Sequence, residues 1–285
     1  RFGNANQTLH QLINHDNINK WIIHSPRIDD NFKYGIVMLV VSAEWERQER
    51  QEIRELWASK KESHMQKTGK SLVIFLLGGN SSSCVKQEAR IHNDILQVNV
   101  NETYRNLVYK LELGFRYIKE NIDFQFMAKI DSDTVVHIDR LYQTMQRYEM
   151  TFESVDWLVC KRWDGGPARS RDNYWYVSHH DYPNSTYPTY CNGPGYVMRR
   201  ATLAKIVEHM KNHTVIETED VFFTGIVASG FVSGIIDRGV VEVEYTPYSY
   251  WDGNGPLMSI LCTHYQVSNY RKYENNLSDA WKALK

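Results

Sequence analysis

The chain contains 285 residues, of which 42% are hydrophobic and 13% aromatic, a length and composition that suit one large α/β domain with a sizeable core. Basic residues number 33 and acidic residues 34, so the formal net charge of -1 excludes a broad basic surface for nucleic acid or a membrane. Ligand binding is therefore expected to depend on local sites and not on the overall charge of the protein.

Short apolar strands alternate with amphipathic helices through the first half of the chain. The β-branched run at 35–42 is typical of a strand buried on both faces, and the apolar residues within 107–118 recur at helical spacing. Strands are predicted at 35–42, 71–77, 95–100 and 124–130, and helices at 46–59, 85–92, 107–118 and 138–145. This alternation predicts an α/β, Rossmann-type, mostly parallel sheet flanked by helices on both sides.

The second half of the chain is less regular. A helix is predicted at 203–210 and strands within 230–247, whereas the stretch 164–194, rich in Gly, Pro, Tyr and Trp, is predicted to be a loop. Residues 1–33 are polar and rich in Asn and His, which favours a stem or docking segment. No repeat or low-complexity tract interrupts the remainder, so 34–285 is expected to form one domain.

Two carboxylates stand where the strand predicted at 124–130 ends. Asp131 and Asp133 are separated by one residue, so in an extended chain both side chains point to the same face. Converging acids repel each other unless a positive group lies between them, and a divalent cation that also binds phosphate oxygens fits that need. Ligands of parallel sheets collect beyond the carboxyl ends of the strands, although an acidic turn is the simpler alternative.

A second acidic pair, Glu219 and Asp220, precedes an apolar run to Ala228. Acids in the first turn of a helix are stabilised by its dipole, so helix capping is one interpretation. The other is that one carboxylate faces a cleft and acts as a general base. Upstream, Gly193 and Gly195 lie among aromatic residues and allow close approach of a ligand, but such a turn is also an ordinary connection.

The cysteines and the glycosylation sequons both indicate in which cellular compartment the protein folds. The four cysteines, Cys84, Cys160, Cys191 and Cys262, allow three complete pairings and match no zinc motif, and Cys160 and Cys262 also suit buried free thiols. Six sequons exceed the roughly two expected by chance, which favours passage through the secretory lumen. The sequons are at Asn6, Asn80, Asn101, Asn184, Asn212 and Asn276. No apolar run of about 18 residues and no secretory signal occurs, so a lumenal protein would have lost its targeting segment from this chain.

Four separated motifs occur in the order typical of one family. They are Arg50-x-x-Ile53-Arg54-x-x-Trp57, Lys129-Ile130-Asp131-Ser132-Asp133, Tyr187-Pro188-x-Tyr190-x-x-Gly193-x-Gly195-Tyr196-Val197 and Glu219-Asp220-Val221-x-x-x-Gly225. Through these motifs, residues 34–281 resemble the lumenal β-1,3-glycosyltransferases of glycosyltransferase family 31, which include galactosyltransferases and N-acetylglucosaminyltransferases. The resemblance implies a GT-A fold, a UDP-sugar donor, a glycan acceptor on glycoprotein or glycolipid, and a Golgi type II membrane protein whose anchor is absent from this chain.

The resemblance also implies roles for acidic residues and one histidine. Asp133 would bind Mn²⁺ directly, Asp131 would contact the metal or the ribose, and His264 is the best match to a late metal-binding histidine of the family. Asp220 would be the base that removes the acceptor proton, with Glu219 as the alternative if the helix start is rotated.

Positive and aromatic side chains complete the expected site. Arg50, Arg54 and Lys110 are candidates for contact with the diphosphate or uracil, or else are exposed helix charges. Aromatic candidates for stacking on a sugar, or for ordinary core packing, are Trp163, Trp175, Tyr176, Tyr190 and Trp251.

The expected function is transfer of galactose or N-acetylglucosamine from a UDP-sugar to the 3-hydroxyl of a glycan, with inversion to a β-1,3 linkage. N-acetylgalactosamine as donor sugar and the identity of the acceptor stay open. Two other classes also stay open: a glycoside hydrolase, which pairs carboxylates across a sugar without needing a metal, and a lectin-like descendant that binds sugar without catalysis.

Overall fold

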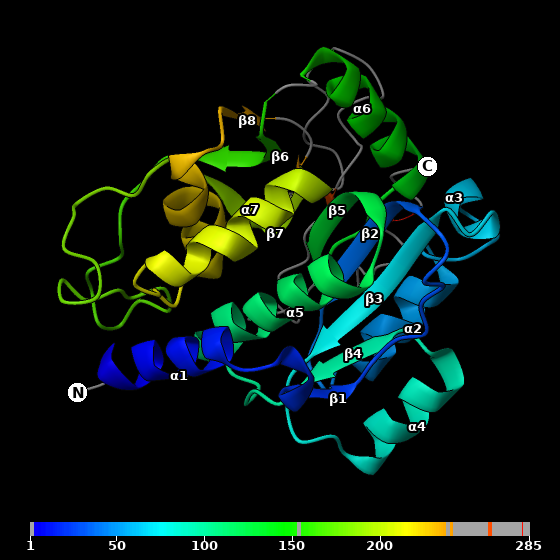
Figure 1. Cartoon of the computed structure of the whole chain (residues 1–285), viewed down its shortest axis with the longest axis horizontal. Helices are drawn as coiled ribbons and strands as arrows, with labels where there is room; N and C mark the ends of the chain where they lie inside the picture. Colours follow the sequence, from blue (N-terminus) through cyan, green and yellow to red (C-terminus); the bar gives the residue numbers. More distant parts are fainter. Residues whose placement is uncertain (1–2, 153–154, 238–239, 242–261, 264–280, 282–285) are drawn as a thin grey trace, which may run out of the picture.

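A computed structural model of the chain describes residues 3–152, 155–237, 240–241, 262–263 and 281. In these residues eight strands form one mixed sheet at the centre of the molecule (Figure 1). In spatial order they are β1 (Ile22–His24), β4 (Ile95–Val98), β3 (Ser71–Leu77), β2 (Tyr34–Val41), β5 (Phe124–Asp131), β7 (Tyr190–Arg199), β6 (Trp157–Trp163) and β8 (Gly234–Asp237). A separate parallel pair consists of β9 (Val240–Val241) and β10 (Cys262–Thr263).

Most strands of the large sheet run in one direction. β4, β3, β2 and β5 are parallel neighbours, and β6 and β8 run the same way, whereas β1 and β7 are antiparallel to the strands beside them. The predicted α/β fold, a Rossmann-type and mostly parallel sheet flanked by helices, is therefore confirmed.

Helices cover both faces of this sheet. The α-helices are α1 (Gly3–His15), α2 (Arg47–Glu55), α3 (His64–Lys67), α4 (Ser83–His92), α5 (Leu107–Asn121), α6 (Ile138–Thr151) and α7 (Arg200–His209). Short 3₁₀ helices are η1 (Ile18–Lys20), η2 (Tyr104–Asn106), η3 (Met210–Asn212) and η5 (Ala228–Gly230), and η4 (Val221–Val227) is a π-helix. In Figure 1, α1, α5 and α7 lie together on one side, with α2 and α4 on the other.

The strand order reverses between β2 and β5. From β2 the chain moves outward through β3 to β4 and then returns to form β5 on the opposite side of β2. Val41 at the end of β2 is paired with Asp131 at the end of β5. Because ligands of open α/β sheets bind at such a reversal, beyond the carboxyl ends of the strands, the fold itself puts Asp131 at the expected ligand site.

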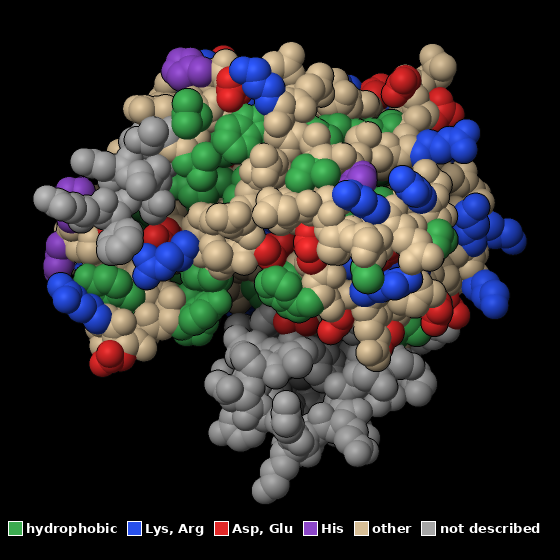
Figure 2. Space-filling view, turned by 90° about the horizontal axis from the view of Figure 1, so that it is seen from below, with side chains coloured by type: hydrophobic (Ala, Val, Ile, Leu, Met, Phe, Trp, Pro, Cys, Tyr) green, Lys and Arg blue, Asp and Glu red, His purple; other side chains and the backbone are tan. Residues whose placement is uncertain are grey.

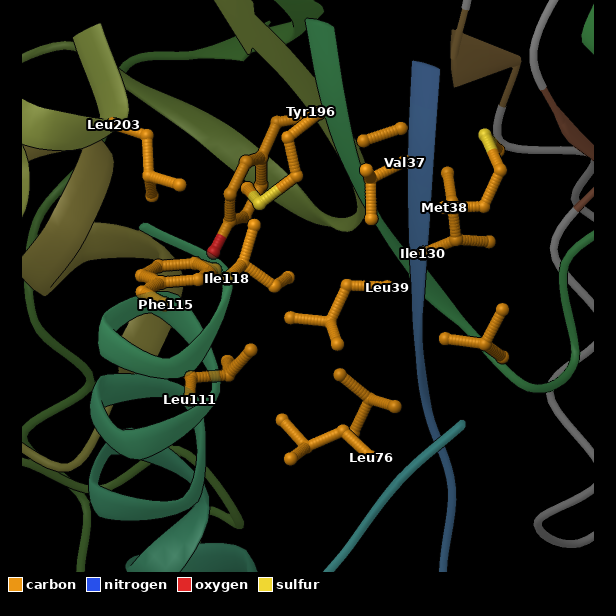
Figure 3. Packing of buried hydrophobic residues seen from close by; sticks show 14 of the residues in the cluster. Val37, Met38, Leu39, Leu76, Leu111, Phe115, Ile118, Ile130, Tyr196 and Leu203 are labelled. Atoms are coloured by element: carbon orange, nitrogen blue, oxygen red, sulfur yellow. The ribbon is translucent and has the colours of Figure 1, made fainter. Parts of the chain in front are cut away.

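The helix α5 packs closely on the sheet because a glycine faces it. A Cβ atom at Gly114 would lie only 2.7 Å from Leu76 Cδ2 on β3. Figure 3 shows Leu111 and Phe115 of α5 directed toward Leu39 of β2, and all three side chains are fully buried. Burial of each such side chain contributes about 1.5–3 kcal/mol, so this core holds β2 and its neighbours in a fixed frame.

The segment predicted to be a stem or docking segment packs, where the structure describes it, against the rest of the fold. β1 pairs with β4 and extends the sheet, and Ile13 and Ile18 are buried. The His10 Nδ1 atom of α1 lies 2.8 Å from Glu112 Oε2 of α5, and both side chains are buried. A boundary at residue 33 stays a prediction.

Parts of the sheet lie where no strand is predicted. β6 forms where no strand is predicted, and β7 begins at Tyr190, inside the stretch 164–194 that is predicted to be a loop. Gly193, Pro194 and Gly195 obscure this strand because glycine and proline are depleted in strands. β8 and β9 fall in the predicted range 230–247, of which 238–239 and 242–247 lie outside the described residues.

Cys160 of β6 and Cys191 of β7 form a disulfide, with their Cα atoms 5.5 Å apart. This pairing excludes the buried free thiol that the sequence left open for Cys160. Cys84 is exposed and carries a free thiol, and the side chain of Cys262 lies outside the described residues.

Sequons and membrane spans can be assessed in the described part of the chain. Asn80, Asn101, Asn184 and Asn212 are exposed, as glycosylation requires, whereas the side chains of Asn6 and Asn276 are not among those described. Within the same part, no helix combines the length and apolar character needed to cross a bilayer.

Candidate active site

The Asp-Ser-Asp motif follows β5 in a tight turn. β5 ends at Asp131, and the Thr134 N–H donates to the Asp131 carbonyl at 3.1 Å, so Asp133 lies in the turn rather than on an extended chain. Asp133 therefore does not continue the extended strand from which a face shared with Asp131 is predicted. Ser132 Oγ donates to Glu46 Oε2 at 2.8 Å, and that oxygen also accepts from the Ala43 N–H at 2.8 Å. These bonds attach the loop after β2 to the motif.

Lys129 brings the two acidic motifs together. Its ammonium lies 2.7 Å from Asp131 Oδ1 and 2.9 Å from Glu219 Oε1, and it donates to the Gly193 carbonyl at 2.6 Å. Burial alone would lower the pKa of Lys129, but the two carboxylates raise it above its ordinary value, so the ammonium is charged. One cation thus joins the end of β5, β7 and the segment before η4.

Glu219 is buried and has two partners. Its Oε1 faces Lys129, and its Oε2 accepts a hydrogen bond from the Tyr196 hydroxyl at 3.1 Å. Burial raises the pKa of Glu219, although Lys129 opposes that effect. Both carboxylate oxygens are thereby held in position within the protein.

Asp220 has a different environment from Glu219. Its Oδ1 accepts from the Val221 N–H at 2.8 Å, which is the capping contact expected at the start of a helix. Burial, followed by the negative charge of Glu219, raises the pKa of Asp220 to about 7. A Cβ atom at Gly193 would lie 3.5 Å from Asp220 Oδ2, so the glycine leaves space beside that oxygen. A carboxylate with a pKa near neutrality suits a general base.

The charge of Asp220 acts on two tyrosines, Tyr104 and Tyr190. Burial, followed by the charge of Asp220, raises the pKa of Tyr104 and of Tyr190, and both phenols therefore stay neutral.

Figure 2 views the molecule from below, the side toward which the β3 and β4 arrows point in Figure 1. Acidic side chains gather near the middle of this face, and hydrophobic side chains lie beside them.

The predicted phosphate-binding cations are engaged elsewhere. Arg50 is fully buried, and its guanidinium pairs with Glu88 at 2.7 Å. Arg54 pairs with Glu88 at 2.9 Å and with Asp94 at 2.7 Å. The two arginines of the first motif therefore have protein carboxylates as partners and need no ligand to balance their charge. Neither arginine is an exposed helix charge.

Lys110 and Arg50 both contact the residue that follows β2. Lys110 Nζ donates to the Ser42 carbonyl at 3.1 Å and pairs with Glu102 at 2.5 Å. Arg50 donates to Ser42 Oγ at 2.9 Å and to the Ala43 carbonyl at 2.5 Å. Because this loop also carries Glu46, the two cations hold the strand end against which the Asp-Ser-Asp turn rests.

Oxygen ligands for a divalent cation are available at the end of β5. Carboxylates are hard donors that Mn²⁺ accepts, and Lys129 neutralises only part of the charge on the four carboxyl groups of the two motifs. Among the residues that the structure describes, no three His, Cys, Asp or Glu side chains form a ready metal site. A cation at Asp131 and Asp133 would therefore complete its shell with substrate oxygens, water or a ligand from the remaining chain, where His264 lies.

Several residues of this site were not assigned from the sequence. Lys129 is the one charged residue in a strand predicted to be buried, and such a lysine signals a buried acidic partner. Glu46 and Tyr104 give no comparable signal, because each belongs to a segment that the sequence marks only as a helix or loop. Tyr196 lies within a matched motif, but its hydroxyl contact depends on the pairing of β7 with β5.

Comparison with known proteins identifies the family. The family model described as Galactosyltransferase matches residues 48–234, and the chain belongs to this family. Human β-1,3-galactosyltransferase 5 is 30% identical over 192 residues, covering 66% of this chain and 60% of its own length. Mouse β-1,3-galactosyltransferase 1 is 29% identical over 210 residues, covering 71% of this chain and 63% of its own length. The chain spans about three fifths of the length of these relatives.

Among solved structures, residues 1–349 of S. aureus TarS match 70% of this chain and 57% of their own length, with 13% sequence identity and a TM-score of 0.41. The family membership confirms the resemblance that the four motifs indicate and defines the protein as a member of a glycosyltransferase family.

Proposed function

We propose that the protein is a metal-dependent, inverting β-1,3-glycosyltransferase that moves galactose or N-acetylglucosamine from a UDP-sugar to the 3-hydroxyl of a glycan. The observation that carries this proposal is the contact of Lys129 with both Asp131 and Glu219, which brings Asp220 to the strand end where ligands collect. Membership of the galactosyltransferase family supports galactose as the first donor to test.

In the proposed reaction, Asp220 accepts the proton of the acceptor 3-hydroxyl while that oxygen forms a bond to C1 of the donor sugar. The bond from C1 to the diphosphate oxygen breaks in the same displacement, and UDP leaves with the bonding electrons. The anomeric configuration changes from α to β. A pKa of about 7 supports Asp220 in this role, whereas Glu219, held by Lys129 and Tyr196, is the alternative base and otherwise positions its neighbour.

Mn²⁺ would be held by Asp133, with Asp131 beside it and His264 as a third candidate ligand outside the described residues. When bound, the cation would stabilise the negative charge of the leaving diphosphate. Because Arg50, Arg54 and Lys110 are engaged by carboxylates, we propose that none of them touches the diphosphate directly, and that Arg50 and Lys110 support the loop after β2.

We also propose that the protein works in the Golgi lumen as a type II membrane protein. Its acceptor would be a glycan on a glycoprotein or glycolipid. The Cys160–Cys191 disulfide and the exposed sequon asparagines support an oxidising, glycosylating compartment, with N-glycans at some of these asparagines.

The test is a UDP-release assay with UDP-galactose, UDP-N-acetylglucosamine and UDP-N-acetylgalactosamine, with Mn²⁺ or with a chelator, and with a panel of glycan acceptors. We expect acceptor-dependent UDP release that requires Mn²⁺ and yields a β-1,3 product. Release of free sugar from a glycan without a UDP donor would establish the hydrolase instead. Glycan binding without turnover of any donor would establish the lectin-like alternative.

Two variants test the assigned roles. Asp220→Asn should lower turnover by about 10²–10⁴-fold, and Asp133→Ala should abolish Mn²⁺-dependent turnover. Glu208→Gln is the matched control, because Glu208 is an exposed carboxylate on α7 to which no role in the site is assigned. Full turnover in either site variant would remove that residue from its role.

A further inference from the structure

Three aromatic side chains from two distant segments meet beside the acidic site. Tyr104 of η2 packs against Tyr174 with 4.6 Å between ring centroids and an angle of 47°. Trp175 stands at 89° to Tyr174, with 5.9 Å between centroids. We call Tyr104, Tyr174 and Trp175 the aromatic platform.

The outer two members of the platform are unusually exposed for large aromatic groups. The exposed fraction is 69% for Tyr174 and 52% for Trp175. A cluster of exposed aromatic side chains on a protein surface marks a place where something binds. Tyrosine and tryptophan suit a sugar in particular, because each presents an apolar ring face together with a polar edge.

The turn that carries Tyr174 and Trp175 is well braced. Asn173 Oδ1 accepts from the Trp175 N–H at 2.8 Å, and the Val177 N–H donates to the Ala168 carbonyl at 3.0 Å. Arg169 donates to the carbonyls of Val177, Tyr182 and Asn184 at 2.8, 2.7 and 2.7 Å. The exposure of the two rings therefore belongs to an ordered turn that presents them to solvent.

The inner member of the platform connects it to the catalytic carboxylates. η2 is tied to the acidic segment by the contact of Arg105 with Glu217, two residues before Glu219. Tyr104 precedes Arg105 in η2 and its ring contacts Tyr174, so the platform adjoins the segment that carries Glu219 and Asp220. The platform thus runs from solvent at Trp175 to the neighbourhood of Asp220.

We propose that the aromatic platform binds a pyranose ring of the acceptor glycan and directs its reactive hydroxyl toward Asp220. This inference rests on the proposed function and adds the acceptor-binding residues to it. The ligand class is a hexopyranoside, whose C–H groups would lie on Tyr174 and Trp175 while its hydroxyls would face the carboxylates. Tyr174 and Trp175 are positioning residues, because they hold the acceptor and take no part in proton transfer.

The first test measures glycoside binding without any donor, by saturation-transfer NMR with methyl β-galactoside and methyl β-N-acetylglucosaminide. The wild-type chain should bind at least one of them, and the variant Tyr174→Ala/Trp175→Ala should lose the signal. Trp175→Phe keeps an aromatic ring and should keep binding. Phe152→Ala is the matched control, because Phe152 is 38% exposed at the end of α6, away from the platform.

The second test measures transfer. Tyr174→Ala and Trp175→Ala should each raise the acceptor KM by about tenfold, the loss expected for one stacking contact, with less than a twofold change in kcat. Phe152→Ala should leave both constants unchanged. A double variant that binds glycosides like the wild-type chain, or a wild-type chain that binds neither glycoside, would overturn the platform. Glycoside binding that depends on the platform, in a chain that turns over no donor, would instead overturn only the proposed transferase activity.

Discussion

Lys129 and Glu219, 90 residues apart in sequence, form a buried ion pair with 2.9 Å between Nζ and Oε1. The same ammonium contacts Asp131, so one side chain compensates acids from both motifs. Charges are costly to remove from water unless they are paired and hydrogen-bonded. This arrangement explains how the two acidic motifs can share one strand end.

Replacing Lys129 should destabilise the protein. Lys129→Met leaves Asp131 and Glu219 without their shared cation, and breaking a buried pair in this way costs about 3–5 kcal/mol. Chemical denaturation at pH 7.5 measures the loss. Lys129→Met/Glu219→Gln should recover part of it, because one uncompensated charge is removed. Lys20→Met, which breaks an exposed pair with Asp16, should change stability by less than about 1 kcal/mol. Equal stability of Lys129→Met and wild type would contradict the assigned role.

The pH dependence of transfer should report on Asp220. Its pKa of about 7 means that the carboxylate becomes the active base only as the pH rises through neutrality, so kcat/KM should fall below pH 7. Glu219→Gln removes the negative charge that raises this pKa, and the acidic limb should move to lower pH. An acidic limb that stays in place in Glu219→Gln would show that another group controls it.

Asp220→Asn should stabilise the unliganded protein at high pH. The pKa of Asp220 is higher in the folded chain than the ordinary 3.8, so the folded state holds the proton more tightly and stability declines as the pH rises from about 4 to 7. Removing the ionisable group should therefore add about 1–4 kcal/mol at pH 8 and little at pH 4. Thermal unfolding at both pH values measures the difference, and a variant that is less stable at pH 8 would contradict the argument.

Loss of the disulfide should weaken the fold. Cys160→Ala/Cys191→Ala removes a covalent link across 31 residues, a change worth about 2–4 kcal/mol. The thermal unfolding midpoint of this double variant should be compared with that of Cys84→Ser. The control alters only an exposed thiol and should have little effect on the midpoint. Reductant should lower the midpoint of the wild-type chain toward that of the double variant but leave the double variant unchanged.

Adding a methyl group at Gly193 should reduce activity without unfolding the chain. The new Cβ would lie 3.5 Å from Asp220 Oδ2, an ordinary contact distance, but it would fill the space beside the proposed base. We expect Gly193→Ala to lower kcat/KM by about tenfold or more, because small displacements at a reacting centre are costly. Gly230→Ala is the control, since nothing lies within 4 Å of a Cβ there. Unaltered kcat/KM in Gly193→Ala would show that the acceptor does not use this space.

The parallel half of the sheet could be predicted because its signals are local. β3 occupies the predicted range 71–77, and β2 and β5 lie within one residue of theirs. Each is a short apolar run closed by polar residues, and each is buried by helices whose own apolar spacing can be read from the sequence. The order of these strands then locates Asp131 without any ligand.

The antiparallel half and the inner site could not be predicted in the same way. β7 contains Gly193 and Gly195, and it exists because β5 and β6 offer hydrogen-bond partners on both sides. The contacts of Lys129 with Glu219 and of Tyr196 with Glu219 follow from that pairing, as does the nearness of Asp220 to Gly193. Such relationships depend on residues that are far apart in the chain, which no local pattern encodes.

The disulfide between Cys160 and Cys191 also has a bearing on how the protein can diversify. The disulfide joins two strands that already pair. The segment that carries Tyr174 and Trp175 therefore leaves and rejoins the sheet at two positions that are linked covalently. Changes of length or sequence in the segment between the two cysteines leave the strands undisturbed, and with them Lys129 and the acidic residues. If the aromatic platform binds the acceptor as proposed, acceptor preference can evolve in the segment between the two cysteines while Lys129 and the acidic residues stay constant.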